Sequence, residues 1–82
     1  MPGMAEITPR EALADRVTSA RTAAGISELE LANRTHIART TLQRKLAGAA
    51  EFTVGELDSI ATVLDLDLID LVSIYPSARV AA

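Results

Sequence analysis

The stretch that decides the fold is Leu31-Ala32-Asn33-Arg34-Thr35-His36-Ile37-Ala38-Arg39-Thr40-Thr41-Leu42-Gln43-Arg44-Lys45-Leu46-Ala47-Gly48. It predicts a short helix, a tight turn and a second short helix over about residues 38–47, which the glycine ends. Four positive charges and no negative one fall within the stretch. The outward face of the second helix is therefore cationic and rich in hydroxyl groups, as a helix in the major groove of DNA needs to be.

The composition predicts one all-α domain. The chain has 82 residues, 49% of them hydrophobic, with one Phe, one Tyr and no Trp. A chain of this size buries only about 60–65% of its unfolded surface, so it has room for one small core. Proline occurs only at positions 2, 9 and 76, and nothing between residues 10 and 75 therefore forbids a helix.

Several classes of protein are disfavoured by the sequence. Cysteine is absent, so we expect no disulfide and no thiolate metal site, and a reducing cytoplasm suits the chain. No apolar run approaches the ~18 residues of a membrane span, and the start MPGMAEI lacks the features of a secretory signal. Without a nucleophile–base pair or a glycine-rich phosphate loop, we expect no enzyme, no metal and no cofactor.

The charge is divided unevenly along the chain. Its net value is −3, whereas nucleic-acid binders usually lean basic. Residues 31–50 nevertheless carry +4 and residues 51–70 carry −6. Because the sign of the facing patch decides what a surface attracts, we expect a cationic face on an acidic body, with reduced non-specific affinity for DNA.

Capping boxes predict where three helices begin, since a Ser or Thr caps a helix and a Glu three residues later reaches back. The pairs are Thr8 with Glu11, Ser27 with Glu30, and Thr53 with Glu56. Gly25 is a stop signal, His36 and Asp65 take turn positions, and Asp67 is expected to cap the last helix. These signals predict five helices over about residues 9–24, 28–34, 38–47, 54–64 and 68–74.

The apolar residues repeat at helical spacing and predict the core, with Phe52 stapled against Leu57. The expected core residues are Leu13, Val17, Ala20, Ala24, Leu31, Ala32, Leu42, Leu46, Leu57, Ile60, Ala61, Leu64, Leu68 and Leu71. We expect residues 1–7 and 76–82 to be flexible segments around a domain at 8–75.

The last predicted helix is apolar around most of its circumference. Seven of the ten residues from 66 to 75 are large and apolar, more than so small a domain buries internally. We interpret the surplus as a homodimer interface, although part of the set is simply core. The interface residues are Leu66, Ile69, Val72, Ile74 and Tyr75.

Five short helices with a tight turn between the second and third resemble the lambda-repressor-like helix-turn-helix family of phage Cro proteins and repressors, also called XRE-type. The resemblance covers about residues 12–73. It rests on Ala32, on Ile37 in the turn, on Leu42 and on Gly48 after the second helix of the motif. Residues 39–48, 52–57 and 60–64 look like the actinobacterial and actinophage branch, and a bacterial host cell is therefore expected.

Three positions depart from the family pattern. His36 stands where glycine commonly takes a positive φ, and Ala38 stands where Ser or Thr would cap the helix, at a cost of about 1 kcal/mol. Glu28 replaces the usual Gln at the start of the preceding helix. Its carboxylate would either clamp Arg39 in a base-reading pose or repel phosphate.

The resemblance implies that the outward positions of helix 38–47 contact bases, and Arg, Gln and Thr are side chains that read base edges. The expected base contacts are Arg39, Thr40, Gln43 and Arg44. The expected phosphate contacts are Glu28, Arg34, Thr41, Lys45 and Gly48. The alternatives are a solvated polar face, a pair between Arg34 and Glu30, and a Lys45 stem that covers the core.

We therefore expect a sequence-specific transcription regulator, Cro-like or a small repressor. It would bind double-stranded DNA as a dimer on an inverted repeat, with helix 38–47 in the major groove. The alternative is a helix-turn-helix scaffold that acts as a protein-interaction or antitoxin-like module, through acidic residues 51–70 or the terminal helix.

Overall fold

The computed structural model describes residues 8–73, and these form five helices without a strand. The helices are α1 (Pro9–Ala24), α2 (Glu28–Thr35), α3 (Arg39–Leu46), α4 (Val54–Leu64) and α5 (Leu68–Val72). The predicted all-α fold is confirmed, and so is each predicted helix, with α2 one residue longer than expected and α3 shorter at both ends. The expected end of α5 at residue 74 lies outside the described residues.

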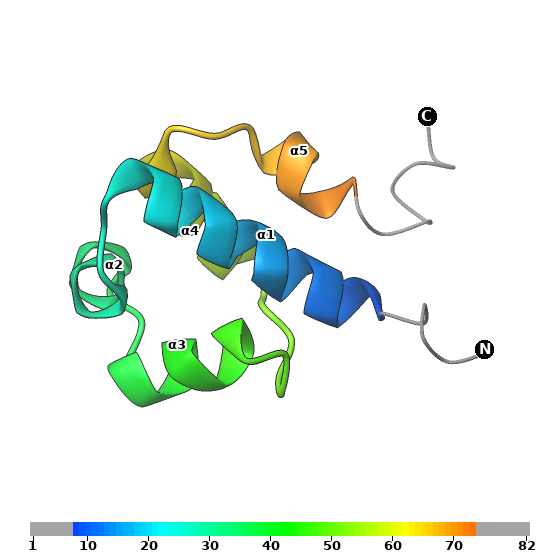
Figure 1. Ribbon diagram of the computed structural model, residues 1–82, viewed down its shortest axis with the longest axis horizontal. Coiled ribbons are helices and arrows are strands. Elements are labelled where there is room, and N and C mark those ends of the chain that lie inside the picture. Colours follow the sequence, from blue (N-terminus) through cyan, green and yellow to red (C-terminus); the bar gives the residue numbers. More distant parts are fainter. Residues whose placement is uncertain (1–7, 74–82) are drawn as a thin grey trace.

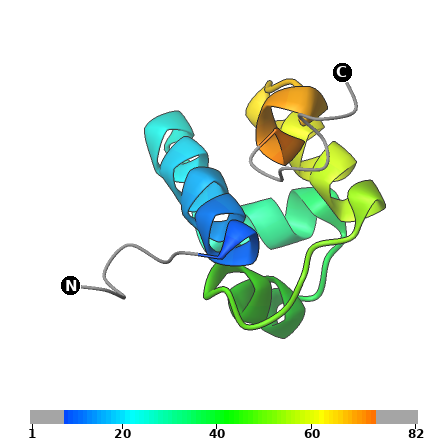
Figure 2. The same cartoon turned by 90° about the vertical axis from the view of Figure 1, so that its right-hand side faces the viewer.

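The packing places α2 and α3 together as a pair. α2 packs against both α3 and α4, while α1 packs against α3, α4 and α5. Figures 1 and 2 show α3 and α5 on opposite sides of the body, with α1 and α4 between them. One outer surface of α3 is therefore left without a covering helix.

The core of the described residues is aliphatic apart from the aromatic ring of Phe52. Leu13, Val17, Leu31, Leu42 and Ile60 are at most 1% exposed, so these five side chains have lost essentially all contact with water. Burial of each aliphatic side chain of this size is worth roughly 1.5–3 kcal/mol. The other members of the buried cluster are Ala32, Phe52, Leu57, Ala61, Leu64 and Leu71.

The helix boundaries follow the capping signals in most cases. Thr8 and Thr53 each form a complete capping box, with Glu11 and Glu56 respectively. Gly25 ends α1 with a φ of +73°. Side-chain bonds that satisfy the first N–H groups of a helix stabilise it by about 1 kcal/mol each, so local sequence fixes where α1 and α4 begin.

Two predicted caps are wrong in part. The Ser27 hydroxyl accepts from the Glu30 N–H at 3.1 Å, but the reciprocal bond of a capping box does not form, since the Glu30 carboxylate pairs with Arg34 instead. Asp67 precedes α5 without accepting a side-chain cap bond. An ion pair one helical turn along therefore competes successfully with the local backbone for Glu30.

The predicted core is wrong at one position and partial at others. Ala24 is exposed at the last position of α1. Ala20, Leu46 and Leu68 are only partly buried against the cluster. Periodicity indicates which face of a helix turns inward but not how far along the helix its neighbours reach.

Candidate nucleic-acid interface

The turn between α2 and α3 begins with hydrogen bonds that close the end of α2. His36 adopts a left-handed conformation with φ 61° and ψ 29°, as predicted for a position that glycine would occupy more easily. Its N–H and that of Ile37 both donate to the Ala32 carbonyl, the latter at 3.2 Å. The buried Thr35 hydroxyl donates to the Leu31 carbonyl at 2.7 Å. The end of α2 is therefore closed by its own backbone and side-chain hydrogen bonds.

The start of α3 has no such support. Ala38 is the residue before the helix and makes no side-chain cap bond, as predicted. One residue of α3 is fully buried: Leu42, at 0% exposure. α3 is therefore held mainly by a single buried leucine and by its packing against α1 and α2.

The exposed face of α3 contains all four of the residues that the sequence predicts as base contacts. Arg39, Thr40, Gln43 and Arg44 are each exposed, at helical spacings that put them on one side of the helix. Within residues 8–73, neither Arg39 nor Arg44 has an ion-pair or side-chain hydrogen-bond partner. The two guanidinium groups are therefore available to a ligand outside the chain.

The residues predicted to contact phosphate are dispersed around this face. Arg34 is exposed and forms an ion pair with Glu30 at 2.6 Å, one of the two alternatives that the sequence leaves open. Glu28 is half-buried at the first position of α2, and no ion pair joins it to Arg39 in the part of the chain described. The clamp of Arg39, one of the two roles that the sequence leaves open for Glu28, is therefore absent from residues 8–73.

The first backbone amides of α2 point out of the helix. The Glu30 N–H is satisfied by Ser27, whereas the Glu28 and Leu29 N–H groups have no acceptor within residues 8–73. Unpaired amides at the positive end of a helix dipole bind anions such as phosphate. Glu28 therefore offers a backbone donor to phosphate even though its carboxylate is repelled by it.

Lys45 and Gly48 are both engaged within the chain. The Lys45 ammonium lies 2.5 Å from a carboxylate oxygen of Glu56, and its side chain is only 13% exposed. The Gly48 N–H donates to the Lys45 carbonyl at 3.1 Å. These contacts compete with the predicted phosphate contacts of both residues. Thr41 is half-buried on the same edge of α3.

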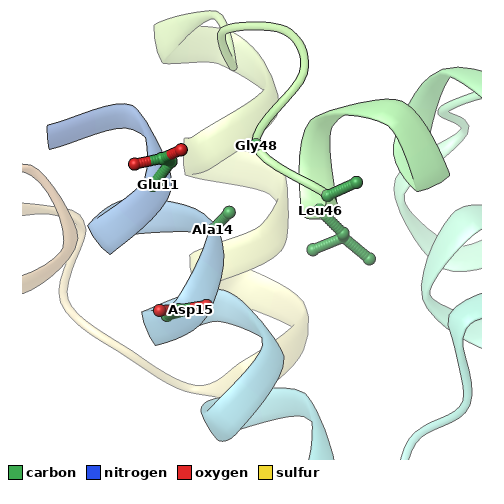
Figure 3. Close-up of a pocket in the computed structure, with 6 residues that line it drawn as sticks. Glu11, Ala14, Asp15, Leu46 and Gly48 are labelled. Atoms are coloured by element: carbon green, nitrogen blue, oxygen red, sulfur yellow. The ribbon is translucent and has the colours of Figure 1, made fainter. Parts of the chain in front are cut away.

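Gly48 is required by conformation and by space. Its φ is +80°, and a Cβ built on it would lie 3.2 Å from the Glu11 Cγ. Gly48 and Leu46, together with Glu11, Ala14 and Asp15 of α1, line an open pocket of about 280 Å³. Figure 3 shows these residues around the pocket. The carboxylates of Glu11 and Asp15 would repel phosphate, so this pocket does not extend the cationic face.

Two long-range contacts could not have been found by scanning the sequence. The Lys45–Glu56 pair joins residues 11 apart, and the Arg16 guanidinium donates to the Asp70 carbonyl at 3.2 Å across 54 residues. Sequence spacing indicates partners within one helix but not across two helices. For the Lys45–Glu56 pair, the sequence offered only Glu56 as a signal, and the capping box with Thr53 already accounts for a glutamate at that position.

Comparison with protein families identifies the fold. The model of the Cro/C1-type HTH DNA-binding domain matches residues 19–77, which cover most of the chain and both helices of the motif. The chain belongs to this family. Comparisons with curated proteins and with solved structures found no match. The expected helix-turn-helix class is therefore confirmed, while the actinobacterial branch stays a prediction.

Membership identifies the exposed face of α3 as part of a DNA-binding domain of the Cro/C1 type. Such domains bind DNA and are not typically enzymes. No helix within residues 8–73 of this Cro/C1-type domain is long and apolar enough to span a membrane. The same residues contain no cluster of three His, Cys, Asp or Glu side chains that would hold a metal ion.

Proposed function

We propose that this Cro/C1-type domain is a sequence-specific transcription regulator that binds double-stranded DNA with α3 in the major groove. The observation that carries the proposal is the exposed, unpaired pair of guanidinium groups on α3, Arg39 and Arg44. Each guanidinium presents a fork of donors that fits the O6 and N7 acceptors of guanine. Thr40 and Gln43, exposed between them, complete a face that can read base edges.

Phosphate contacts would come from both sides of this face. The unpaired amides at Glu28 and Leu29 would grip one phosphate, and Arg34 would exchange its exposed pair with Glu30 for another. An exposed ion pair one turn apart on a helix is worth only about 0.3–0.5 kcal/mol, so that exchange costs little. Thr41, half-buried on α3, would supply a further phosphate contact. We leave Lys45 and Gly48 out of this set because of their contacts within the chain.

The dimer forms part of the same proposal. On α5, Ile69 is 75% exposed and Val72 is half-buried, and Leu66, just before this helix, is 37% exposed. The other two predicted interface residues, Ile74 and Tyr75, lie outside the described residues. We propose that a second copy packs on this apolar surface, and successive major grooves of an inverted repeat require the two α3 helices of such a dimer to lie about 34 Å apart.

Selection of DNA sites from a random pool, followed by gel shifts, tests the proposal. The native chain is expected to enrich one sequence, and Arg39→Ala or Arg44→Ala to lose about 1–3 kcal/mol of discrimination at one base position. Arg34→Ala is the matched contrast, because loss of a phosphate contact weakens binding to all sequences alike. Absence of an enriched site, or unchanged binding by both α3 variants, would refute the proposal.

A second candidate function is a protein-interaction module. Asp65, Asp67 and Asp70 are exposed around Ile69, and residues 51–70 contain six acidic residues and no basic one. An acidic rim around an apolar patch fits a basic partner protein better than DNA. Light scattering after size exclusion separates the two candidates, since a stable complex with a partner and no affinity for DNA would favour this one.

A further inference from the structure

The contact between Lys45 and Glu56 ties the end of α3 to the start of α4. A single oxygen of Glu56, Oε1, accepts from the Lys45 ammonium at 2.5 Å and from the Thr53 N–H at 2.8 Å. The side chains of the pair are 13% and 21% exposed, for Lys45 and Glu56 respectively. The pair is therefore shielded from water on most sides, unlike the exposed pair of Arg34 with Glu30.

The carboxylate of Glu56 is held in its ionised form. Burial by itself raises the pKa of Glu56, but hydrogen bonds from Lys45 and the Thr53 N–H, together with the lysine charge, outweigh it. The net pKa of Glu56 lies below its ordinary value. The positive end of the α4 dipole favours the same anion. At neutral pH, Lys45 therefore faces a full negative charge that is fixed in place by a helix cap.

This pairing changes the charge that α3 offers to DNA. Three cations lie on α3, and two of them, Arg39 and Arg44, are exposed and unpaired within residues 8–73. The third, Lys45, has its charge compensated inside the chain. To reach a phosphate it would have to leave Glu56 as a partly buried carboxylate without its counter-ion, which is costly.

We propose that Glu56 withholds Lys45 from DNA, so that α3 engages DNA through Arg39 and Arg44 and the domain's affinity for random sequence stays low. The inference rests on the proposed function. Non-specific binding depends on the number of phosphates neutralised, whereas the base contacts of α3 do not involve Lys45. Glu56 therefore acts as a positioning residue for the lysine, with no contact to DNA of its own.

The test measures the salt dependence of binding to a random-sequence duplex by fluorescence anisotropy between 50 and 200 mM NaCl. Glu56→Gln keeps an oxygen that can cap α4 but removes the charge that holds Lys45. One additional phosphate contact steepens the salt slope by ~0.9, so the affinity of this variant is expected to fall about 3.5-fold more than that of the native chain over this range.

Three further variants isolate the effect of the lysine. Asp58→Asn removes one exposed carboxylate from the same helix and is expected to keep the native slope, which excludes an effect of net charge alone. Lys45→Gln combined with Glu56→Gln is expected to return the slope to the native value. Lys45→Gln alone is expected to leave the slope unchanged, and it tests the proposal even if the Glu56 variant fails to fold.

The outcomes separate the two proposals. A native slope in Glu56→Gln, or a reduced slope in Lys45→Gln alone, overturns the role of Glu56 while the proposed function stands. A native chain that binds no duplex at any of these salt concentrations overturns the proposed function itself, and this inference with it. Circular dichroism of each variant confirms that the helical content is retained.

Discussion

The starts of α3 and α4 are close in sequence but differ in how they are capped. α4 begins with a complete capping box. The Thr53 hydroxyl accepts from the Glu56 N–H at 3.0 Å, and the Glu56 carboxylate accepts from the Thr53 N–H at 2.8 Å. α3 begins after Ala38, which caps nothing, and after His36 in a left-handed conformation. The comparison shows that the start of α4 is stabilised by its own capping residues, whereas α3 is stabilised by its packing against α1 and α2.

The proposed function accounts for this difference. An N-cap side chain at Ala38 and a glycine at His36 would both stabilise the motif, yet neither is present. Residues near a binding site commonly retain such local costs, because the stability is supplied elsewhere in the fold. For α3, the compensating stability comes from the burial of Leu42 and from the ion pair between Lys45 and Glu56.

The largest effect on this comparison is expected from Leu42→Ala. Leu42 is the only fully buried side chain of α3, and leucine-to-alanine changes in a core cost about 2–5 kcal/mol because a cavity remains. Urea unfolding is expected to show a loss in that range. Gln43→Ala, one residue away and exposed, is the control and should change stability by less than about 0.5 kcal/mol. Equal losses from both variants would contradict the view that packing holds α3.

A smaller loss is expected from Thr53→Ala, which removes the cap of α4. Loss of a threonine cap costs about 1 kcal/mol, and thermal unfolding should fall by roughly 4–8 °C for a domain of this size. Thr62→Ala is the matched control, since the Thr62 hydroxyl only donates to the Asp58 carbonyl one turn back, on an exposed part of α4. If the control lost as much as Thr53→Ala, the cap would not be the cause.

The smallest effect, and the only gain, is expected from Ala38→Ser, which gives α3 the cap that it lacks. The hydroxyl can accept from an N–H of the first turn and is expected to stabilise the domain by about 0.5–1 kcal/mol, read as a higher melting temperature. Ala49→Ser, in the exposed loop after α3, supplies a hydroxyl without a helix start and should be neutral. A neutral Ala38→Ser would show that the start of α3 is already satisfied.

Much of the fold could be predicted because its signals are local. The caps at Thr8 and Thr53, the stop at Gly25 and the turn positions His36 and Asp65 each depend on residues within four positions of one another. The exposed set on α3 followed from helical spacing in the same way. Where two local options competed, as for Glu30 between a cap and Arg34, the sequence did not decide between them.

The sequence by itself determined the five helices, both ends of α1 and α4, and the cationic side of α3, because hydrogen bonds and periodicity within one helix need no knowledge of other helices. Only the tertiary structure decided which cations of α3 remain free to contact a ligand such as DNA. The bond of Lys45 to Glu56 and that of Arg16 to the Asp70 carbonyl depend on how α3 meets α4 and how α1 meets α5. Charges attract according to distance in space, and distance in space is set by packing rather than by position along the chain.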